Sequence, residues 1–219
     1  MKVVLITALN KDFDKKLAAA FVRESYKVYA MGNEQQQIEG VTLLPQDLKE
    51  AAAALEKDSG HIDIYIDVSD ERSASDNFNV RRGINDQVIR ELYEANVIRP
   101  MAMLEAFMPL LENGEGKRLC FLTSAEASIN ETRDIDGLGY KMAKAGLHNF
   151  LQITRNVLAP KGCTIRAYDP MHHEVAAELS AEAALNYFTR RRGIEQGDPQ
   201  RDDEGNIVFR DAYGRQHSW

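Results

Sequence analysis

Short runs of apolar residues recur along the chain, and segments with helical spacing separate all of them except the second run from the third. The first run, Val3 to Ile6, contains no polar residue. A short run that is apolar throughout is typical of a strand in a parallel sheet, because helices cover both faces of such a sheet. The runs predict strands at 3–6, 27–31, 41–44, 62–68, 118–123 and 164–168, and a short last strand at 207–209.

Helical periodicity fills the intervals between these strands. In residues 15–24, apolar side chains recur at the spacing of one helix face. Similar patterns predict helices from Asp47 through 55, over 84–111 with an interruption around Pro100, over 140–158 and over 176–188. Strands that alternate with helices predict an α/β fold: a doubly wound parallel sheet in a Rossmann-like three-layer α/β/α arrangement.

The 219 residues are expected to form one domain, 1–219, since two domains would each have barely more than a hundred residues. The one shift in composition is the segment 190–205, which is rich in Arg, Asp and Glu. It is expected to be an exposed charged loop rather than a linker. Residues 206–219 would then supply the last strand and a C-terminal tail.

The charge balance argues against some classes of partner. Lys and Arg number 27 and Asp and Glu 34, so the formal net charge is −7, which disfavours binding to nucleic acids or to anionic membranes. No apolar run approaches the roughly 18 residues of a membrane-spanning helix, and the N-terminal apolar run is too short for a signal peptide. We expect a cytoplasmic protein in which Cys120 and Cys163 are buried free thiols.

One short motif carries chemistry. Tyr140 and Lys144 lie four residues apart in a predicted helix and therefore share a face. A neighbouring ammonium favours the phenolate and lowers the pKa of a tyrosine, as general acid–base catalysis near neutral pH requires. Ser124 ends the preceding predicted strand, where its hydroxyl could bind a substrate oxygen, and Asn96 lies in the long helix before that strand.

This arrangement resembles the short-chain dehydrogenase/reductase family from Lys2 to about Gly214. The resemblance implies a catalytic tetrad of Asn96, Ser124, Tyr140 and Lys144 and hydride transfer between NAD or NADP and a carbonyl or alcohol. Tyr140 would be the acid/base, and Ser124, with Ser128 as the fallback, would hold the substrate oxygen. Lys144 would bind the nicotinamide ribose and tune Tyr140, and Asn96 would anchor a water molecule in a proton relay.

The segment that resembles the family's cofactor loop departs from the pattern. Glycines in that loop let the backbone approach the pyrophosphate, but here Ala8, Asp12 and Asp14 replace them. The resemblance still places Thr7, Asn10, Lys11 and Asp47, together with Tyr140 and Lys144, at the cofactor. Asp12, Asp14 and Asp47 have an alternative interpretation as helix caps, and the preference between NAD and NADP stays open.

Two functional hypotheses follow. The first is an active oxidoreductase with an atypical cofactor pocket, which would act on a small carbonyl or alcohol. The second is a non-catalytic relative, a pseudoenzyme with defective cofactor binding that serves as a subunit or scaffold. The resemblance implies a homo-oligomer, a dimer or tetramer, or a mixed assembly with an active paralogue. No metal is expected, because His172 and His173 have no further ligands at suitable spacing and are interpreted as surface residues.

Overall fold

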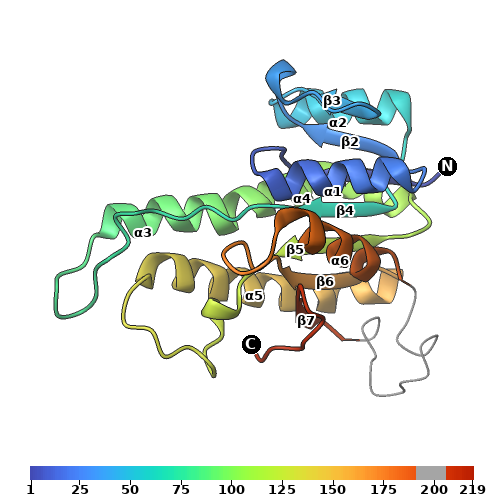
Figure 1. Cartoon of the computed structure of the whole chain (residues 1–219). Helices are drawn as coiled ribbons and strands as arrows, with labels where there is room; N and C mark the ends of the chain where they lie inside the picture. Colours follow the sequence, from blue (N-terminus) through green and yellow to red (C-terminus); the bar gives the residue numbers. More distant parts are fainter. Residues whose placement is uncertain (191–205) are drawn as a thin grey trace.

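In a computed structural model, residues 1–190 and 206–219 are described, and they form one seven-stranded parallel sheet in the order β3-β2-β1-β4-β5-β6-β7 (Figure 1). The strands are β1 (Val3–Ile6), β2 (Lys27–Met31), β3 (Val41–Leu44), β4 (Ile64–Asp67), β5 (Arg118–Leu122), β6 (Thr164–Asp169) and β7 (Val208–Asp211). Each of the seven predicted strands is confirmed.

Helices cover both faces of the sheet. One face packs against α1 (Asp12–Arg23) and α6 (Ala177–Thr189), and the other against α2 (Leu48–Asp58), α4 (Arg99–Asn113) and α5 (Leu138–Leu158). Short helical turns lie at Glu34–Gln36, Ala125–Ala127 and Ala159–Lys161. The predicted three-layer α/β/α arrangement is therefore confirmed, and the two layers of helix enclose one hydrophobic cluster on each side of the sheet.

The longest helical segment departs from its prediction. It runs without a break from α3 (Asp86–Tyr93) through a π-helical turn (Glu94–Ile98) into α4, and it projects with the preceding segment beyond the sheet (Figure 1). The chain is not broken at Pro100, which lies in the first turn of α4. The irregularity expected around this proline is the π turn that directly precedes α4 and contains Asn96.

The strand order reverses between β1 and β4. The chain builds β1, β2 and β3 outward, then returns to place β4 on the other side of β1. In sheets of this kind, ligands bind outside the carboxyl ends of the strands at that reversal. The segments that leave β1, β4, β5 and β6 therefore meet where a ligand would lie.

The remaining features of the C-terminal part can be compared only in part. The predicted charged loop at 190–205 falls, apart from Arg190, outside the described residues. Residues 206–219 do form the last strand and a tail, and the Trp219 ring packs on His148 and Phe209 of the same chain. Cys120 and Cys163 are buried and free, as expected. None of the helices in the described residues is both long and apolar enough to cross a membrane.

Candidate active site

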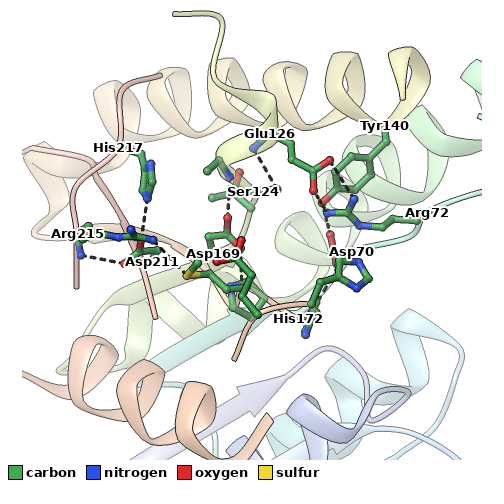
Figure 2. A pocket seen from close by; sticks show the side chains of 16 residues that line it. Asp70, Arg72, Ser124, Glu126, Tyr140, Asp169, His172, Asp211, Arg215 and His217 are labelled. Atoms are coloured by element: carbon green, nitrogen blue, oxygen red, sulfur yellow. Dashed lines mark hydrogen bonds and ion pairs between the residues drawn. The ribbon is translucent and has the colours of Figure 1, made fainter. Parts of the chain in front are cut away.

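A cavity of about 190 Å³ lies at the carboxyl ends of β5, β6 and β7, beside the segment that follows β4 (Figure 2). Tyr140 and Arg72 lie on one side, His217 and Arg215 on the other, and Ser124 and Asp169 between them. Among the described residues, the lining consists of Asp70, Arg72, Thr123, Ser124, Ala125, Glu126, Tyr140, Asp169, Pro170, Met171, His172, His173, Glu174, Asp211, Arg215 and His217.

Helix α5 positions the tyrosine and the lysine of the sequence motif. Asp76 accepts hydrogen bonds from the backbone N–H groups of Gly139 (2.9 Å) and Tyr140 (2.8 Å), and so caps the first turn of the helix. Tyr140 and Lys144 are nearly inaccessible, at 3% and 0% exposed. The Lys144 Nζ atom donates to the carbonyl oxygens of Ser69 (2.5 Å) and Leu122 (3.2 Å). The helix thus presents both side chains to the ends of β4 and β5.

Ser124 and Ser128 occupy different surroundings. Ser124 is the second residue after β5 and lines the cavity beside Tyr140, while its Oγ also accepts from the backbone N–H of Glu126 (3.3 Å). The Ser128 hydroxyl accepts from the backbone N–H of Glu131 (3.2 Å) and is directed at the Trp219 carbonyl (3.5 Å). The geometry therefore favours Ser124 over the fallback.

Asn96 is fully buried, and its side chain binds backbone groups of the segment that carries Asp70. Its amide nitrogen donates to the carbonyl oxygens of Glu71 and Leu92 (both 2.9 Å), and its carbonyl oxygen accepts from the backbone N–H of Glu71 (3.0 Å). A π turn leaves helix carbonyls without their usual partners, and Asn96 satisfies one of them. Asn96 therefore fixes the segment that carries Asp70 rather than touching Tyr140 or Lys144.

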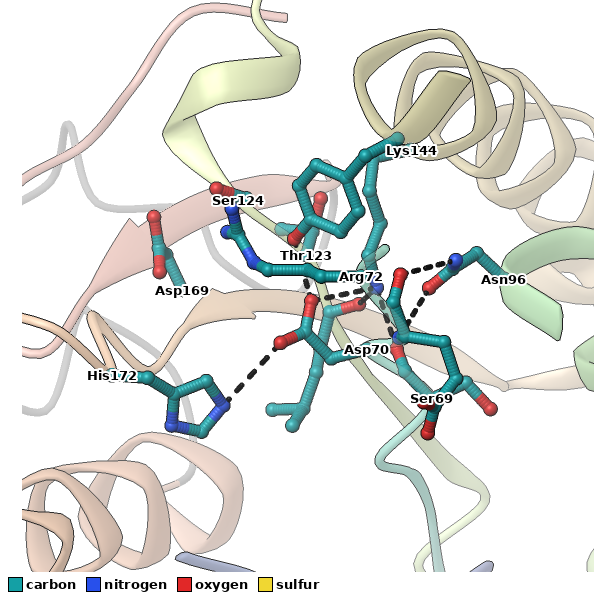
Figure 3. Close-up of polar contacts among 12 residues, drawn as sticks. Ser69, Asp70, Arg72, Asn96, Thr123, Ser124, Lys144, Asp169 and His172 are labelled. Atoms are coloured by element: carbon teal, nitrogen blue, oxygen red, sulfur yellow. Dashed lines mark hydrogen bonds and ion pairs between the residues drawn. The ribbon is translucent and has the colours of Figure 1, made fainter. Parts of the chain in front are cut away.

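Asp70 is the centre of the cluster (Figure 3). The Tyr140 hydroxyl donates to Asp70 Oδ1 (2.5 Å), and Lys144 Nζ lies 3.5 Å from the same oxygen. Lys11 Nζ lies 3.0 Å from Oδ2 and also donates to the Asp70 carbonyl oxygen. His172 Nε2 lies 3.5 Å from Oδ2. One carboxylate that is 3% exposed thus holds both residues of the Tyr-x-x-x-Lys motif.

Asp70 reverses the expected effect on the tyrosine. Burial raises the pKa of Tyr140 well above its usual range, and the Asp70 charge raises it further, although Arg72 and Ser124 act in the opposite direction. Burial alone would raise the pKa of Asp70, but Lys144 and Lys11 outweigh it and hold that pKa well below the usual range. Burial lowers the pKa of Lys144. The prediction that Lys144 lowers the Tyr140 pKa is wrong for this state. The Asp70 carboxylate neutralises the lysine charge, and it also accepts a hydrogen bond from the Tyr140 hydroxyl.

Several residues of the site were not found from the sequence. Arg72 lies over the Tyr140 ring, 4.0 Å from its centroid, and binds Glu126 through two hydrogen bonds (2.9 and 3.2 Å). His172, expected at the surface, is partly buried against the Phe13 ring and Asp70. A usable signal existed for Asp70, Asp169 and Asp211, since an acidic residue soon after a predicted strand lies where ligands bind.

The far wall of the cavity is a second polar cluster around Asp211. Asp211 accepts from Arg215 Nε (2.6 Å) and lies 2.9 Å from His217 Nε2, while His217 Nδ1 lies 3.2 Å from Glu131. Burial acts to lower the pKa of His217, but its two carboxylate partners outweigh burial and raise it. These contacts fold the C-terminal tail back over the end of the sheet.

The candidate cofactor residues have structural partners in this state. Thr7 Oγ1 accepts from the backbone N–H of Val68 (3.1 Å) and joins the ends of β1 and β4. Asn10 accepts from Gln36 Nε2 (3.0 Å). Asp47 caps α2 by accepting from the backbone N–H groups of Lys49 and Glu50 (both 3.0 Å), as the alternative interpretation proposed. Their role toward a cofactor stays a prediction.

Asp14 stands where the family has a glycine, and it is buried at the start of α1. Its Oδ2 accepts from the Lys11 backbone N–H (2.8 Å), whereas its buried Oδ1 has no hydrogen-bond partner. Burial raises the pKa of Asp14 to about 7, although the Lys11 backbone and charge oppose the shift. The alternative interpretation of Asp14 as a cap is therefore confirmed, and the cap is a carboxyl that prefers its neutral form.

We expect Asp14→Asn to stabilise the protein above neutral pH and not below pH 4. Because the folded-state pKa is about 7 against an ordinary 3.8, folding favours the protonated carboxyl, and ionisation destabilises the fold as pH rises from 4 to 7. The cost is at most about 4 kcal/mol. Denaturant unfolding of both proteins at pH 5 and pH 8 measures the difference. A difference in unfolding free energy that does not change between the two pH values would contradict the prediction.

A nicotinamide dinucleotide would lie across the carboxyl ends of β1 and β4. There the Lys11–Asp70 ion pair joins the two loops, and Asp70 occupies the Lys144 contact that the resemblance gives to the ribose. Tyr140 and Lys144 could contact such a cofactor only after Asp70 turns away, because both are bound to its carboxylate. Ala8, Asp12 and Asp14 further hinder close approach of the backbone to a pyrophosphate.

Comparison with known proteins gives a consistent result. No family model matches the chain. An uncharacterized oxidoreductase of Schizosaccharomyces pombe is 26% identical over 141 residues, which are 64% of this chain and 53% of that protein. The match thus spans about half the length of this curated relative.

Solved structures align over the full length. The carbonyl reductase Sniffer of D. melanogaster has a TM-score of 0.81 at 14% identity, covering 100% of both chains. A carbonyl reductase from Pseudomonas aeruginosa PAO1, in complex with NADP, has a TM-score of 0.76 at 19% identity, again covering 100% of both chains. A short-chain dehydrogenase/reductase from Burkholderia multivorans with bound NADP has a TM-score of 0.76 at 15% identity, covering 100% of this chain and 99% of that one. The resemblance to the short-chain dehydrogenases/reductases is confirmed at the level of the fold, which this chain shares.

Proposed function

We propose that the chain is an NAD(P)-dependent oxidoreductase that interconverts a small carbonyl compound and its alcohol at the cavity beside Tyr140. The observation that carries the proposal is the convergence of Ser124, Tyr140 and Lys144 at one end of the sheet, with Asn96 bracing the adjoining segment. The carbonyl reductases that share the fold, and the fission yeast oxidoreductase, support the same class of reaction.

The residues divide the work as follows. The bound cofactor would supply or accept the hydride. Tyr140 protonates the carbonyl oxygen as it becomes an alkoxide, and the Ser124 hydroxyl holds that oxygen in place. Lys144 is fixed by the carbonyl oxygens of Ser69 and Leu122, so it keeps its position when Asp70 releases it. Its charge then lowers the pKa of Tyr140, because the opposing carboxylate is gone.

Titration with NADH and NADPH, read by calorimetry or thermal shift, tests the first step. We expect saturable binding that is weak, because the cofactor must displace Asp70 before it reaches Lys144. Binding at micromolar concentration would mean that the Lys11–Asp70 pair opens readily. No binding at millimolar concentration would refute the proposal for the isolated chain.

The contacts of the Asp70 carboxylate also favour a second function. A site whose tyrosine and lysine are both bound to an internal aspartate suits a non-catalytic subunit or scaffold. This alternative predicts no turnover of any carbonyl and no cofactor binding, even when Asp70 is removed. Co-purification with an active paralogue from the native host would support it.

Assembly is also a proposal. The resemblance implies that subunits meet through the long helical segment that contains Asn96 and through the helix that contains Tyr140. Exposed apolar side chains lie on both: Ile98 and Met101 on the first, and Met142, Ile153 and Val157 on α5. We expect a homodimer or homotetramer, and Ile153→Glu should shift it toward monomer in light scattering after gel filtration. A monomer at micromolar concentration for the unaltered chain would contradict this expectation.

A further inference from the structure

The cavity wall is built almost entirely of polar side chains. Of the 16 that line it, only Ala125, Pro170 and Met171 are apolar. Among the described residues, no tryptophan or phenylalanine side chain lines it, and the face of the Tyr140 ring is covered by Arg72. A carbonyl compound without further hydrogen-bonding groups would leave polar side chains of the wall without partners, which is costly in a buried site.

Charged groups in the wall are already paired with one another. Glu126 binds Arg72, and Asp211 binds Arg215 (2.6 Å). In the described lining, five carboxylates, those of Asp70, Glu126, Asp169, Glu174 and Asp211, stand against two arginines and three histidines. A carboxylate or phosphate ligand offers only acceptors, so it would face this excess of carboxylates, and both arginines of the described lining are already paired.

The Asp169 carboxylate lies between the Arg72–Glu126 pair and the Arg215–Asp211 pair (Figure 2). Its Oδ2 accepts from the backbone N–H of Ala125 (2.7 Å), and its Oδ1 from that of Met171 (2.8 Å). Each carboxylate oxygen has two acceptor positions. One position on each oxygen thus remains for a donor, and a hydroxyl group is an uncharged donor that also accepts.

From this geometry we propose that the ligand of the cavity is a small, uncharged, polyhydroxylated compound, a sugar or polyol whose hydroxyl groups donate to Asp169. The volume of about 190 Å³ is below the roughly 300 Å³ at which drug-sized pockets begin, so it suits a single monosaccharide-sized unit. The inference rests on the proposed function only in placing the reacting carbon beside Tyr140; the binding itself needs no cofactor.

Calorimetry or saturation-transfer NMR on the full chain, without cofactor, tests the inference. The panel contains pentoses, hexoses and their alditols, with gluconate, glucosamine and cyclohexanone as the acidic, cationic and apolar arms. We expect at least one neutral hydroxylated compound to bind ten-fold or more tightly than gluconate and cyclohexanone, and no more weakly than glucosamine. A preference for any of these arms, equal affinities, or no binding at all would overturn the inference.

A pair of variants locates the binding. Asp169→Asn should weaken binding of the preferred compound at least ten-fold, whereas Glu105→Gln, which neutralises an exposed carboxylate on α4, should leave it unchanged. An unchanged affinity in folded Asp169→Asn would contradict the assignment to this residue. If that variant does not fold, the ranking of ligands on the unaltered chain still decides the matter.

The outcomes separate this inference from the proposed oxidoreductase. Binding of a polyol without any binding of NADH or NADPH would retain the ligand class and refute the oxidoreductase. Cofactor-dependent turnover of cyclohexanone, with no turnover of sugars, would support the oxidoreductase and refute the proposed ligand class.

Discussion

Replacing Asp70 by alanine is expected to tighten binding of NADH or NADPH at least ten-fold. The Asp70 carboxylate accepts from Tyr140 (2.5 Å) and pairs with Lys11 (3.0 Å) and Lys144 (3.5 Å). A ligand that uses the same groups must first break these contacts, and each factor of ten in affinity corresponds to about 1.4 kcal/mol. Removing the carboxylate removes that competition and one negative charge from the path of the phosphates.

The same variant changes the titration of Tyr140 without any ligand. Asp70 contributes to the raised pKa of the phenol, so the Tyr140 pKa should fall in Asp70→Ala. Ultraviolet difference spectra across alkaline pH, with Tyr140→Phe to assign the signal, measure the shift. If neither cofactor affinity nor the Tyr140 titration changes, Asp70 does not restrain the site.

Stability must be followed beside these readouts. Removing one partner of a buried ion pair costs about 3 to 5 kcal/mol, although Lys144 keeps its two carbonyl partners. Asp70→Asn is the milder variant, since an amide can still accept from Tyr140. Glu71→Ala is the matched control, because Glu71 is the next residue, its side chain is exposed, and its contacts with Asn96 are made by the backbone.

Replacing Tyr140 by phenylalanine is expected to reduce turnover of any carbonyl substrate by about 10² to 10⁴, the usual contribution of a general acid. The ring and its contact with Arg72 remain, so the fold should survive. Asp70 loses a hydrogen-bond donor but keeps Lys11 and Lys144. The effect should appear in kcat at saturating substrate rather than in KM alone.

Tyr93→Phe is the control for this experiment. Tyr93 is partly exposed at the end of α3, away from the cavity lining, and its loss of a hydroxyl should leave turnover unchanged. Equal turnover in Tyr140→Phe and the unaltered chain would remove Tyr140 from the proposed mechanism.

The fold could be predicted because its signals are local. Strand β1 is buried along its whole length, and so is β5, which is what apolar runs predict for the centre of a parallel sheet. The spacing of Tyr140 and Lys144 likewise follows from one helix. These statements need no knowledge of how distant segments meet.

The electrostatics of the site could not be predicted in the same way. Asp70 and Tyr140 are 70 residues apart, and their contact depends on the path of the irregular segment after β4. His172 gave no signal either, since its partial burial depends on Phe13 in helix α1 and on Asp70 in the segment after β4. The sign of a pKa shift depends on which charge lies nearest, so it changes once such a partner is added.

The π turn at Glu94–Ile98 has a consequence for how this helix tolerates change in length. A π turn accommodates one residue more than an α-helical turn, so each side chain after it is rotated by about 100° relative to an uninterrupted helix. Deleting a single residue within the turn would therefore produce a regular helix and keep the apolar face of α4, with Phe107 and Leu111, toward the sheet. The same deletion elsewhere in the long helix would rotate that face away by about 100°. A one-residue alignment gap within 94–98 would thus mark a relative with a regular helix that is packed in the same way.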